Sequence, residues 1–285
     1  MFSMFRSKKE EKKSDFVIED DDGNDDSSWI NQLTINLSRL IIYAESADVT
    51  LQKEVAEKLA NEAVKPQRQI QIVECGGLEL LLPLTKSRDV EVQRLAAHAL
   101  ANLSVNADNQ VLMAEKGGIE MLVYLLDVNH DLVQRQAAKA LANISVNADN
   151  KKKVASKGSL PKLVKLISTP NIAVRIEVIA AIANLAVDND NEKALGSHGA
   201  LPLILDNLSY VCEEIRRRDI NTQTEELAAQ SCRAVRNLST NPQNKQEILT
   251  HNGLEYLNLL KTYPNSRISQ QSQKALSNLE QQSRK

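Results

Sequence analysis

Apolar residues recur along this chain at helical spacing, in short segments that return at a fixed interval. Between residues 107 and 146 they predict three successive helices, over about 108–116, 119–128 and 130–146. The second of these carries Ile119, Leu122, Leu125 and Leu126 on one face. The pattern therefore predicts a unit built from three short helices.

The third predicted helix has a near-copy one unit earlier. Residues 95–109 read LAAHALANLSVNADN, and residues 136–150 read QAAKALANISVNADN. The asparagine of the A-N-[LI] step recurs, with weaker copies of the motif, at Asn61, Asn102, Asn143, Asn184, Asn237 and Asn278. Four of the five intervals are 41 residues, and the one from 184 to 237 is 53, which is one period plus a 12-residue insertion. Such a period is typical of a helical solenoid, in which each unit packs only against its neighbours.

A glycine stands between the first and second predicted helices of successive units. These turn residues are Gly76, Gly117, Gly158 and Gly199, and Asn252 takes the place in the last unit. A residue that closes one helix sharply before the next usually needs a positive φ, which costs glycine nothing. Asparagine tolerates this conformation better than most side chains. We therefore expect left-handed backbone at all five positions.

The period divides the chain into an array with two distinct ends. We predict a disordered, charged tail over residues 1–27 and a solenoid over residues 28–285. Within the solenoid we expect an N-terminal cap and five repeats, over 28–65, 66–106, 107–147, 148–188, 189–241 and 242–285. The insertion falls within 209–224, where it is expected to lengthen the second helix of its unit and add a loop before the third.

This pattern resembles the armadillo repeat, which has three helices in about 41 residues, G-[GSA]-[LI] before the second and A-[LVI]-x-N-[LI] on the third. The resemblance covers about residues 48–285. It implies an all-α, right-handed solenoid whose third helices line a concave groove that binds extended peptides. The chain is similar to the β-catenin and vacuolar types, and the pattern does not choose between junctional, vacuolar-membrane, cytoskeletal and kinesin-associated members.

Composition and motifs argue against several other classes of protein. The formal charge of −2 gives no overall attraction for nucleic acid, and no apolar run reaches the roughly 18 residues of a membrane span. Three cysteines without metal spacing and the absence of phosphate-loop, dinucleotide, zinc-protease or serine-hydrolase motifs indicate no catalysis. We expect no cofactor, metal or small-molecule substrate, and a cytoplasmic location, with the nucleus as an alternative.

The marker asparagines are the main candidates for function. At 100° per residue, the apolar positions of its helix centre roughly 160° away from Asn102, so we expect this asparagine on an exposed face. Asparagine is about 0.5 kcal/mol less favourable than alanine in a helix, so its repetition needs a reason. Two reasons stay open. The carboxamide could bind an adjacent helix end, or, as the armadillo resemblance implies, it could bind the backbone of a partner chain.

Side chains one and two turns before the asparagines would contact such a chain. The candidate groove residues are Asn102, Asn143, Asn184, Asn237, Arg94, His98, Arg135, Lys139 and Arg233. This basic stripe favours an extended acidic partner, although Glu54, Glu57, Glu91 and Glu177 lie on or near the same face and leave a solvated face of mixed charge as the alternative. No tryptophan flanks the asparagines, which disfavours a nuclear import adaptor of the importin-α kind.

Three further hypotheses concern partners. Arg216, Arg217 and Arg218 in the insertion form a second candidate contact patch. The acidic stretch from Glu19 to Asp26 is close enough in sequence to compete with partners for the groove. Because some armadillo proteins act on small GTPases, regulation of a GTPase as an exchange factor or chaperone is an alternative to scaffolding.

Overall fold

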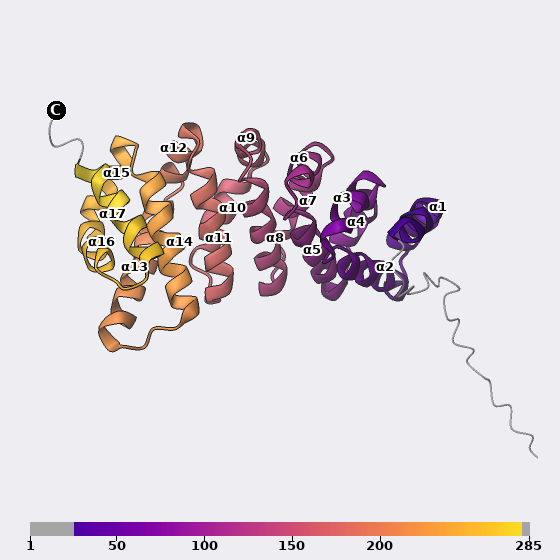
Figure 1. The fold of residues 1–285 in the computed structure, drawn as a ribbon, viewed down its shortest axis with the longest axis horizontal. Helices are drawn as coiled ribbons and strands as arrows, with labels where there is room; N and C mark the ends of the chain where they lie inside the picture. The colour runs from indigo at the N-terminus through magenta and orange to yellow at the C-terminus, as the bar shows by residue number, and fades with distance from the viewer. Residues whose placement is uncertain (1–25, 281–285) are drawn as a thin grey trace, which may run out of the picture.

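The computed structural model describes residues 26–280 of the 285-residue chain, and these residues form one elongated array of helices without a strand (Figure 1). The helices are α1 Asp26–Glu45, α2 Val49–Glu62, α3 Pro66–Glu74, α4 Gly77–Thr85, α5 Val90–Leu103, α6 Ala107–Glu115, α7 Gly118–Leu125, α8 Asp131–Ile144, α9 Ala148–Ser156, α10 Ser159–Leu166, α11 Ile172–Leu185, α12 Asn189–Ser197, α13 Ala200–Arg217, α14 Thr222–Leu238, α15 Pro242–Thr250, α16 Gly253–Lys261 and α17 Ser266–Glu280.

From α3 onwards the helices follow a three-helix plan. The first helices of the units (α3, α6, α9, α12 and α15) lie along the upper edge of the array in Figure 1. The third helices (α5, α8, α11, α14 and α17) each pack against the third helix of the next unit, and α2 packs against α5. These side-by-side contacts confirm the predicted all-α solenoid of three-helix repeats.

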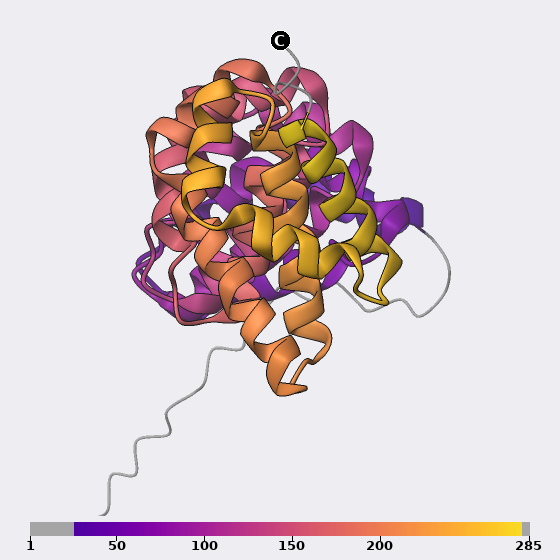
Figure 2. The same ribbon diagram turned by 90° about the vertical axis from the view of Figure 1, so that its left-hand side faces the viewer.

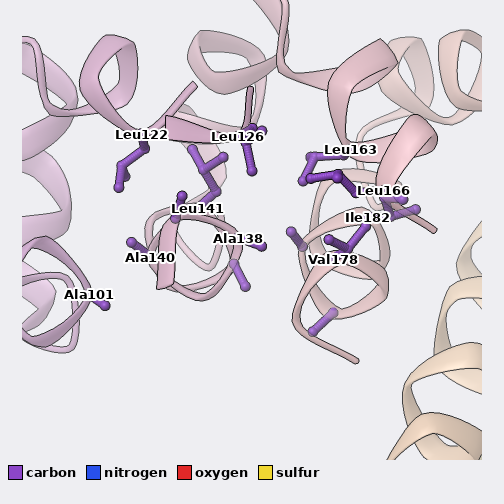
Figure 3. Packing of buried hydrophobic residues seen from close by; sticks show 14 of the residues in the cluster. Ala101, Leu122, Leu126, Ala138, Ala140, Leu141, Leu163, Leu166, Val178 and Ile182 are labelled. Atoms are coloured by element: carbon purple, nitrogen blue, oxygen red, sulfur yellow. The ribbon is translucent and has the colours of Figure 1, made fainter. Parts of the chain in front are cut away.

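Small apolar side chains allow the third helices to approach closely. In α8, Ala137, Ala138 and Ala140 are fully buried. Figure 3 shows Ala140 on the side of α8 that faces α5 and Ala138 on the side that faces α11. Leu141 completes the contact by packing beneath α7. Removing this apolar area from water contributes roughly 25 cal/mol per Å², which is the main force that joins one repeat to the next.

The predicted turn geometry is confirmed at all five positions. The glycines Gly76, Gly117, Gly158 and Gly199 have φ between 75° and 87°, and Asn252 has φ of 58°. A Cβ added at Gly117, Gly158 or Gly199 would meet no atom within 4 Å, so the backbone conformation alone favours glycine there.

The insertion forms a helical hairpin. Helix α13 has 18 residues where α10 has 8, and α14 has 17 where α11 has 14. The turn between them includes Arg218, whose φ is 61°. Figures 1 and 2 show this hairpin extending below the neighbouring repeats. The extra residues are therefore added at the end of the unit opposite to the first helices.

The N-terminal end starts with α1, which packs against α2 and α4. This helix begins at Asp26, two residues before the boundary of 28 expected from the sequence. The helix begins with aspartate and two serines, Asp26, Ser27 and Ser28, which are residue types that favour a helix N-terminus. Because Asp26 also ends the acidic run, the sequence pattern placed it in the charged tail. Most of the predicted tail, residues 1–25, lies outside the described residues, and so does most of the acidic stretch from Glu19 to Asp26.

Candidate functional site

Four of the six marker asparagines lie in a row across successive third helices. Asn102 is in α5, Asn143 in α8, Asn184 in α11 and Asn237 in α14, and each is half-buried. The exposed face that the helical periodicity predicted for Asn102 is therefore only partly exposed in the structure. An isolated helix has only one buried side, whereas each third helix here also has a neighbouring third helix on either flank.

Three of these asparagines donate hydrogen bonds to the preceding repeat. Nδ2 of Asn143 lies 3.1 Å from Oγ of Ser104. Nδ2 of Asn184 and of Asn237 each lie 2.7 Å from a carbonyl oxygen, that of Ala142 and that of Ala183 respectively. The acceptors all lie at the C-terminal end of the preceding third helix, where carbonyl groups lack partners within the helix. Of the two explanations left open, the bond to an adjacent helix end is therefore present.

Asn102 differs from the others because its carboxamide donates no hydrogen bond to the preceding repeat. Its Nδ2 is buried and has no hydrogen-bond partner within the described residues. Ser104 accepts from Asn143, and the residue 41 positions before Ser104 is Ala63, which has no hydroxyl. The row therefore starts with a carboxamide that is not committed to a neighbouring helix.

The carboxamides keep part of their hydrogen-bonding capacity. Each bond to the preceding repeat uses one of two N–H groups, and among the described residues nothing donates to Oδ1 of Asn143 or Asn184. Oδ1 of Asn237 accepts from Nε of Arg236 at 3.0 Å. The middle of the row can therefore still accept hydrogen bonds from a partner backbone.

We call the solvent-facing side of α5, α8, α11 and α14 the third-helix surface; its cations are partly paired with carboxylates. Arg94 binds Glu91 of its own helix through two contacts of 2.6 and 2.7 Å. Arg135 Nε lies 3.7 Å from Oε1 of Glu177, which is in the next repeat. At these two arginines the surface carries both signs of charge, as in the alternative of a face of mixed charge.

Two further cations of the candidate set are not neutralised. Lys139, half-buried on α8, makes no ion pair within the described residues. Arg233 donates from Nη1 to the neutral amide oxygen of Gln230 at 3.1 Å and makes no ion pair within residues 26–280, although the charge of Glu226 acts on it from a distance. Positive charge therefore remains on α8 and α14, in the middle and towards the C-terminal part of the row.

Two groups on this surface have shifted pKa values. Burial lowers the pKa of His98, and the positive charges of Arg94 and Lys139 lower it further. Its imidazole is therefore neutral near pH 7 and offers one donor and one acceptor. Burial also raises the pKa of Glu177, against the opposing effect of Arg135 and Lys139.

The arginines of the insertion lie at the tip of the hairpin. Nη2 of Arg216 is 2.8 Å from Oε1 of Glu255 in α16. Arg217 lies 3.5 Å from Glu213 and 3.2 Å from Glu214. Two of the three arginines are therefore already paired, and a second contact patch at Arg216, Arg217 and Arg218 stays a prediction.

A second row of asparagines was not singled out from the sequence. Asn109, Asn150, Asn191 and Asn244 are buried near the start of α6, α9, α12 and α15. Nδ2 of Asn150 donates to the carbonyl of Gln110 at 2.8 Å and to that of Ile144 at 3.3 Å. The other three make the equivalent bond to the preceding first helix. We call these four the buried row.

The sequence did contain a signal for this buried row. Asn109 and Asn150 stand at the end of the repeated 15-residue segment, and Asn191 follows after another 41 residues. Each lies three residues after an Asx residue that caps the helix, as Asn147 does for Asn150. A polar residue that recurs directly after a cap is a candidate for a structural bond between units.

Residues 26–280 contain no cluster of three or more histidine, cysteine, aspartate or glutamate side chains placed to hold a metal ion. In the same part of the chain, no helix combines the length and the apolar character that a membrane crossing requires.

Comparison with known proteins identifies the family. The family model described as kinesin-associated protein (KAP) matches residues 46–265. A crystal structure of an engineered protein is 31% identical, with a TM-score of 0.74, over 86% of this chain and 97% of that one. A designed armadillo repeat protein is 27% identical, with a TM-score of 0.73, over 85% and 99%.

A further designed armadillo repeat protein, solved in complex with the peptide (KR)4, is 27% identical, with a TM-score of 0.71, over 85% of this chain and 99% of that one. No curated protein sequence matches the chain. The armadillo resemblance seen in the repeats is thereby confirmed, and the chain belongs to the kinesin-associated protein (KAP) family, with the fold of armadillo repeats.

Proposed function

We propose that this protein is a non-catalytic scaffold whose third-helix surface binds an extended, acidic segment of a partner protein. The observation that carries the proposal is the row of half-buried asparagines with unused acceptors on Asn143 and Asn184, next to Lys139 and Arg233, which make no ion pair within the described residues. Main-chain groups of the segment would bond the carboxamides, and its carboxylates would contact the cations.

The spacing of the helices suits an extended ligand. Packed helices lie about 8–10 Å apart and a strand advances about 3.3 Å per residue, so each repeat would meet about three residues. A hydrogen bond contributes only about 0.5–1.5 kcal/mol net, and association itself costs several kcal/mol. Contacts with the cations must therefore supply much of the affinity and the preference for acidic sequences.

The designed protein in complex with (KR)4 supports an extended charged peptide as the type of ligand that this fold can hold. That peptide is basic, whereas the charge left uncompensated at the groove positions of the present chain is positive. The family description names an association with kinesin, so acidic segments of kinesins belong among the partners to be tested.

A peptide titration tests the proposal. We would measure the anisotropy of labelled peptides of about 15 residues, the length that five repeats would cover, with acidic, basic and neutral sequences. The acidic peptide should bind, with an affinity that falls as salt is added. Preference for the basic peptide would contradict the proposal and would favour an import adaptor.

A matched pair of lysine variants locates the site. Lys139→Gln should weaken binding of the acidic peptide by about fivefold, the effect of about 1 kcal/mol. Lys165→Gln, which removes an exposed lysine from the second helix α10, should leave the affinity unchanged. Equal effects of the two substitutions would place the acidic peptide elsewhere.

The acidic stretch from Glu19 to Asp26 is proposed as a competitor for the same surface. Its neutralisation by Glu19→Gln, Asp20→Asn, Asp21→Asn and Asp22→Asn should raise the affinity of the full-length chain for the acidic peptide. Unchanged affinity would remove the competition and leave the scaffold function standing.

A further inference from the structure

The turns that join each third helix to the next first helix carry a row of exposed valines. Val64, Val105, Val146 and Val187 are 57%, 57%, 64% and 60% exposed, and they follow one another at intervals of 41 residues. The turn itself does not require valine, since Thr240 occupies the corresponding place in the last repeat. The four valines therefore form a periodic row of exposed apolar side chains along one edge of the array.

An additional valine lies between two of these turns. Lys152 on α9 extends towards the turn of Val187, because its Nζ lies 3.7 Å from Asp188 and 3.3 Å from Asp190. The residue 41 positions before Lys152 is Val111 on α6, which is 38% exposed. By equivalence of the repeats, the side chain of Val111 points in the direction of the turn of Val146. We call Val105, Val111, Val146 and Val187 the valine edge.

Aspartates accompany this apolar row. Asp108, Asp149 and Asp190 each follow an edge valine by three residues and are exposed. Asp190 is paired with Lys152, whereas Asp108 and Asp149 make no ion pair within residues 26–280. Lys151 donates from Nζ to the carbonyl oxygens of Val146 and Asn147 at 3.0 and 3.4 Å, so one cation lies against the backbone of this turn, while the exposed carboxylates of Asp108 and Asp149 stay unpaired within residues 26–280. Two copies of this chain meeting edge to edge would bring these carboxylates together. A partner with apolar and cationic side chains fits the valine edge better.

The repeat spacing indicates the secondary structure of that partner. Successive repeats lie about 10 Å apart, and seven residues of an α-helix rise about 10.5 Å. A helix with an apolar residue at every seventh position would therefore present the same face to Val105, Val146 and Val187 in turn. An extended strand covers the same distance in about three residues, an odd number, so its side chains would alternate between facing the edge and facing away.

We propose that the valine edge is a second docking surface, which binds a basic amphipathic helix of a partner protein. The helix would lie across the ends of α5, α8 and α11, with apolar residues on the valines and lysines or arginines near Asp108 and Asp149. This surface is separate from the third-helix surface and opposite to it in charge preference. The scaffold could thereby hold an acidic segment and a basic helix at once.

Binding of a defined helical peptide tests this proposal. The probe is a peptide of about 21 residues, or three heptads, with leucine at the apolar positions and lysine beside them. A matched peptide carries glutamate in place of lysine. The lysine peptide should bind the full-length protein more tightly than the glutamate peptide by at least about tenfold, because only it complements the aspartates.

Substitutions then assign the contact. The triple variant Val105→Thr, Val146→Thr and Val187→Thr keeps the shape of each side chain and adopts the residue found at position 240. It should weaken the lysine peptide by about tenfold, the loss of roughly 1.4 kcal/mol. Its thermal midpoint and its affinity for the acidic peptide of the third-helix surface should remain those of the wild type, since these valines are exposed.

The double variant Asp108→Asn and Asp149→Asn separates the charge contribution. It should reduce the difference between the lysine and glutamate peptides while leaving the apolar contribution in place. Unchanged binding of the lysine peptide by the threonine variant would overturn the proposal. So would a concentration-dependent dimer of the wild type that the threonine variant loses, since the edge would then be an interface between copies.

Discussion

The two rows of asparagines use the same side chain at the same period and differ in their surroundings. Asn150 of the buried row is 1% exposed, and its Nδ2 donates to two carbonyl groups of the preceding repeat, that of Gln110 in the first helix and that of Ile144 at the end of the third. Asn143 of the third-helix row is half-buried, and its Nδ2 has one acceptor, a serine hydroxyl. The comparison shows that a repeated polar residue can serve folding, binding or both, and that burial decides which.

The largest expected effect is the loss of protein stability when a residue of the buried row is replaced. Asn150→Ala removes two hydrogen bonds and leaves buried carbonyl groups of Gln110 and Ile144 with fewer partners. We expect a loss of about 2–4 kcal/mol. Because repeat arrays need not unfold in one step, the measurement is the shift of the urea midpoint followed by circular dichroism. A midpoint equal to that of the wild type would show that this row is dispensable.

The next largest effect concerns the contact between α12 and the turn that leads into α15. Glu192, buried on α12, accepts from the backbone N–H of Thr240 at 3.0 Å and of Asn241 at 2.6 Å, and from the Thr240 hydroxyl at 2.6 Å. Glu192→Gln weakens these charge-assisted bonds, with an expected loss of about 1–2 kcal/mol in the same denaturation assay. The control Glu213→Gln, at an exposed position of the insertion, should change the midpoint little.

A smaller effect on stability is expected in the third-helix row. Asn143→Ala removes one half-buried hydrogen bond to Ser104 but introduces a residue with a higher helix propensity. The net loss in the free energy of unfolding should therefore be below about 1 kcal/mol. The triple variant Asn143→Ala, Asn184→Ala and Asn237→Ala should nevertheless weaken the acidic peptide by about tenfold or more in the anisotropy assay. If the triple variant were strongly destabilised and bound normally, the two rows would have the same role.

The smallest expected effect is a pH dependence from His98. Burial and two neighbouring cations lower the pKa of its imidazole in the folded state, while the unfolded chain takes up a proton near pH 6.5. The unfolded state therefore binds more protons as the pH falls below about 6.5, and stability is lost in that direction. The difference in thermal midpoint between wild type and His98→Gln should change between about pH 7.5 and pH 5.5, with the variant losing less. An unchanged difference would mean that His98 does not titrate differently in the folded state.

The fold was predictable because it depends on local patterns that repeat. Apolar spacing, turn glycines such as Gly117 and the 41-residue interval each indicated the same three-helix unit. The partial burial of Asn143 and Asn184 could not be derived, because it depends on how closely neighbouring third helices approach. The pairing of Arg135 with Glu177 likewise joins residues of different repeats, and the sequence gives no measure of the distance between them.

The account rests on the claim that the third-helix row is available to a ligand while the buried row is not. Nuclear magnetic resonance of side-chain amide groups in the full-length protein measures both rows in one titration with the acidic peptide. The Nδ2 signals of Asn143, Asn184 and Asn237 should shift, and those of Asn109, Asn150, Asn191 and Asn244 should stay in place. Shifts confined to other residues, or equal shifts in the two rows, would contradict the account.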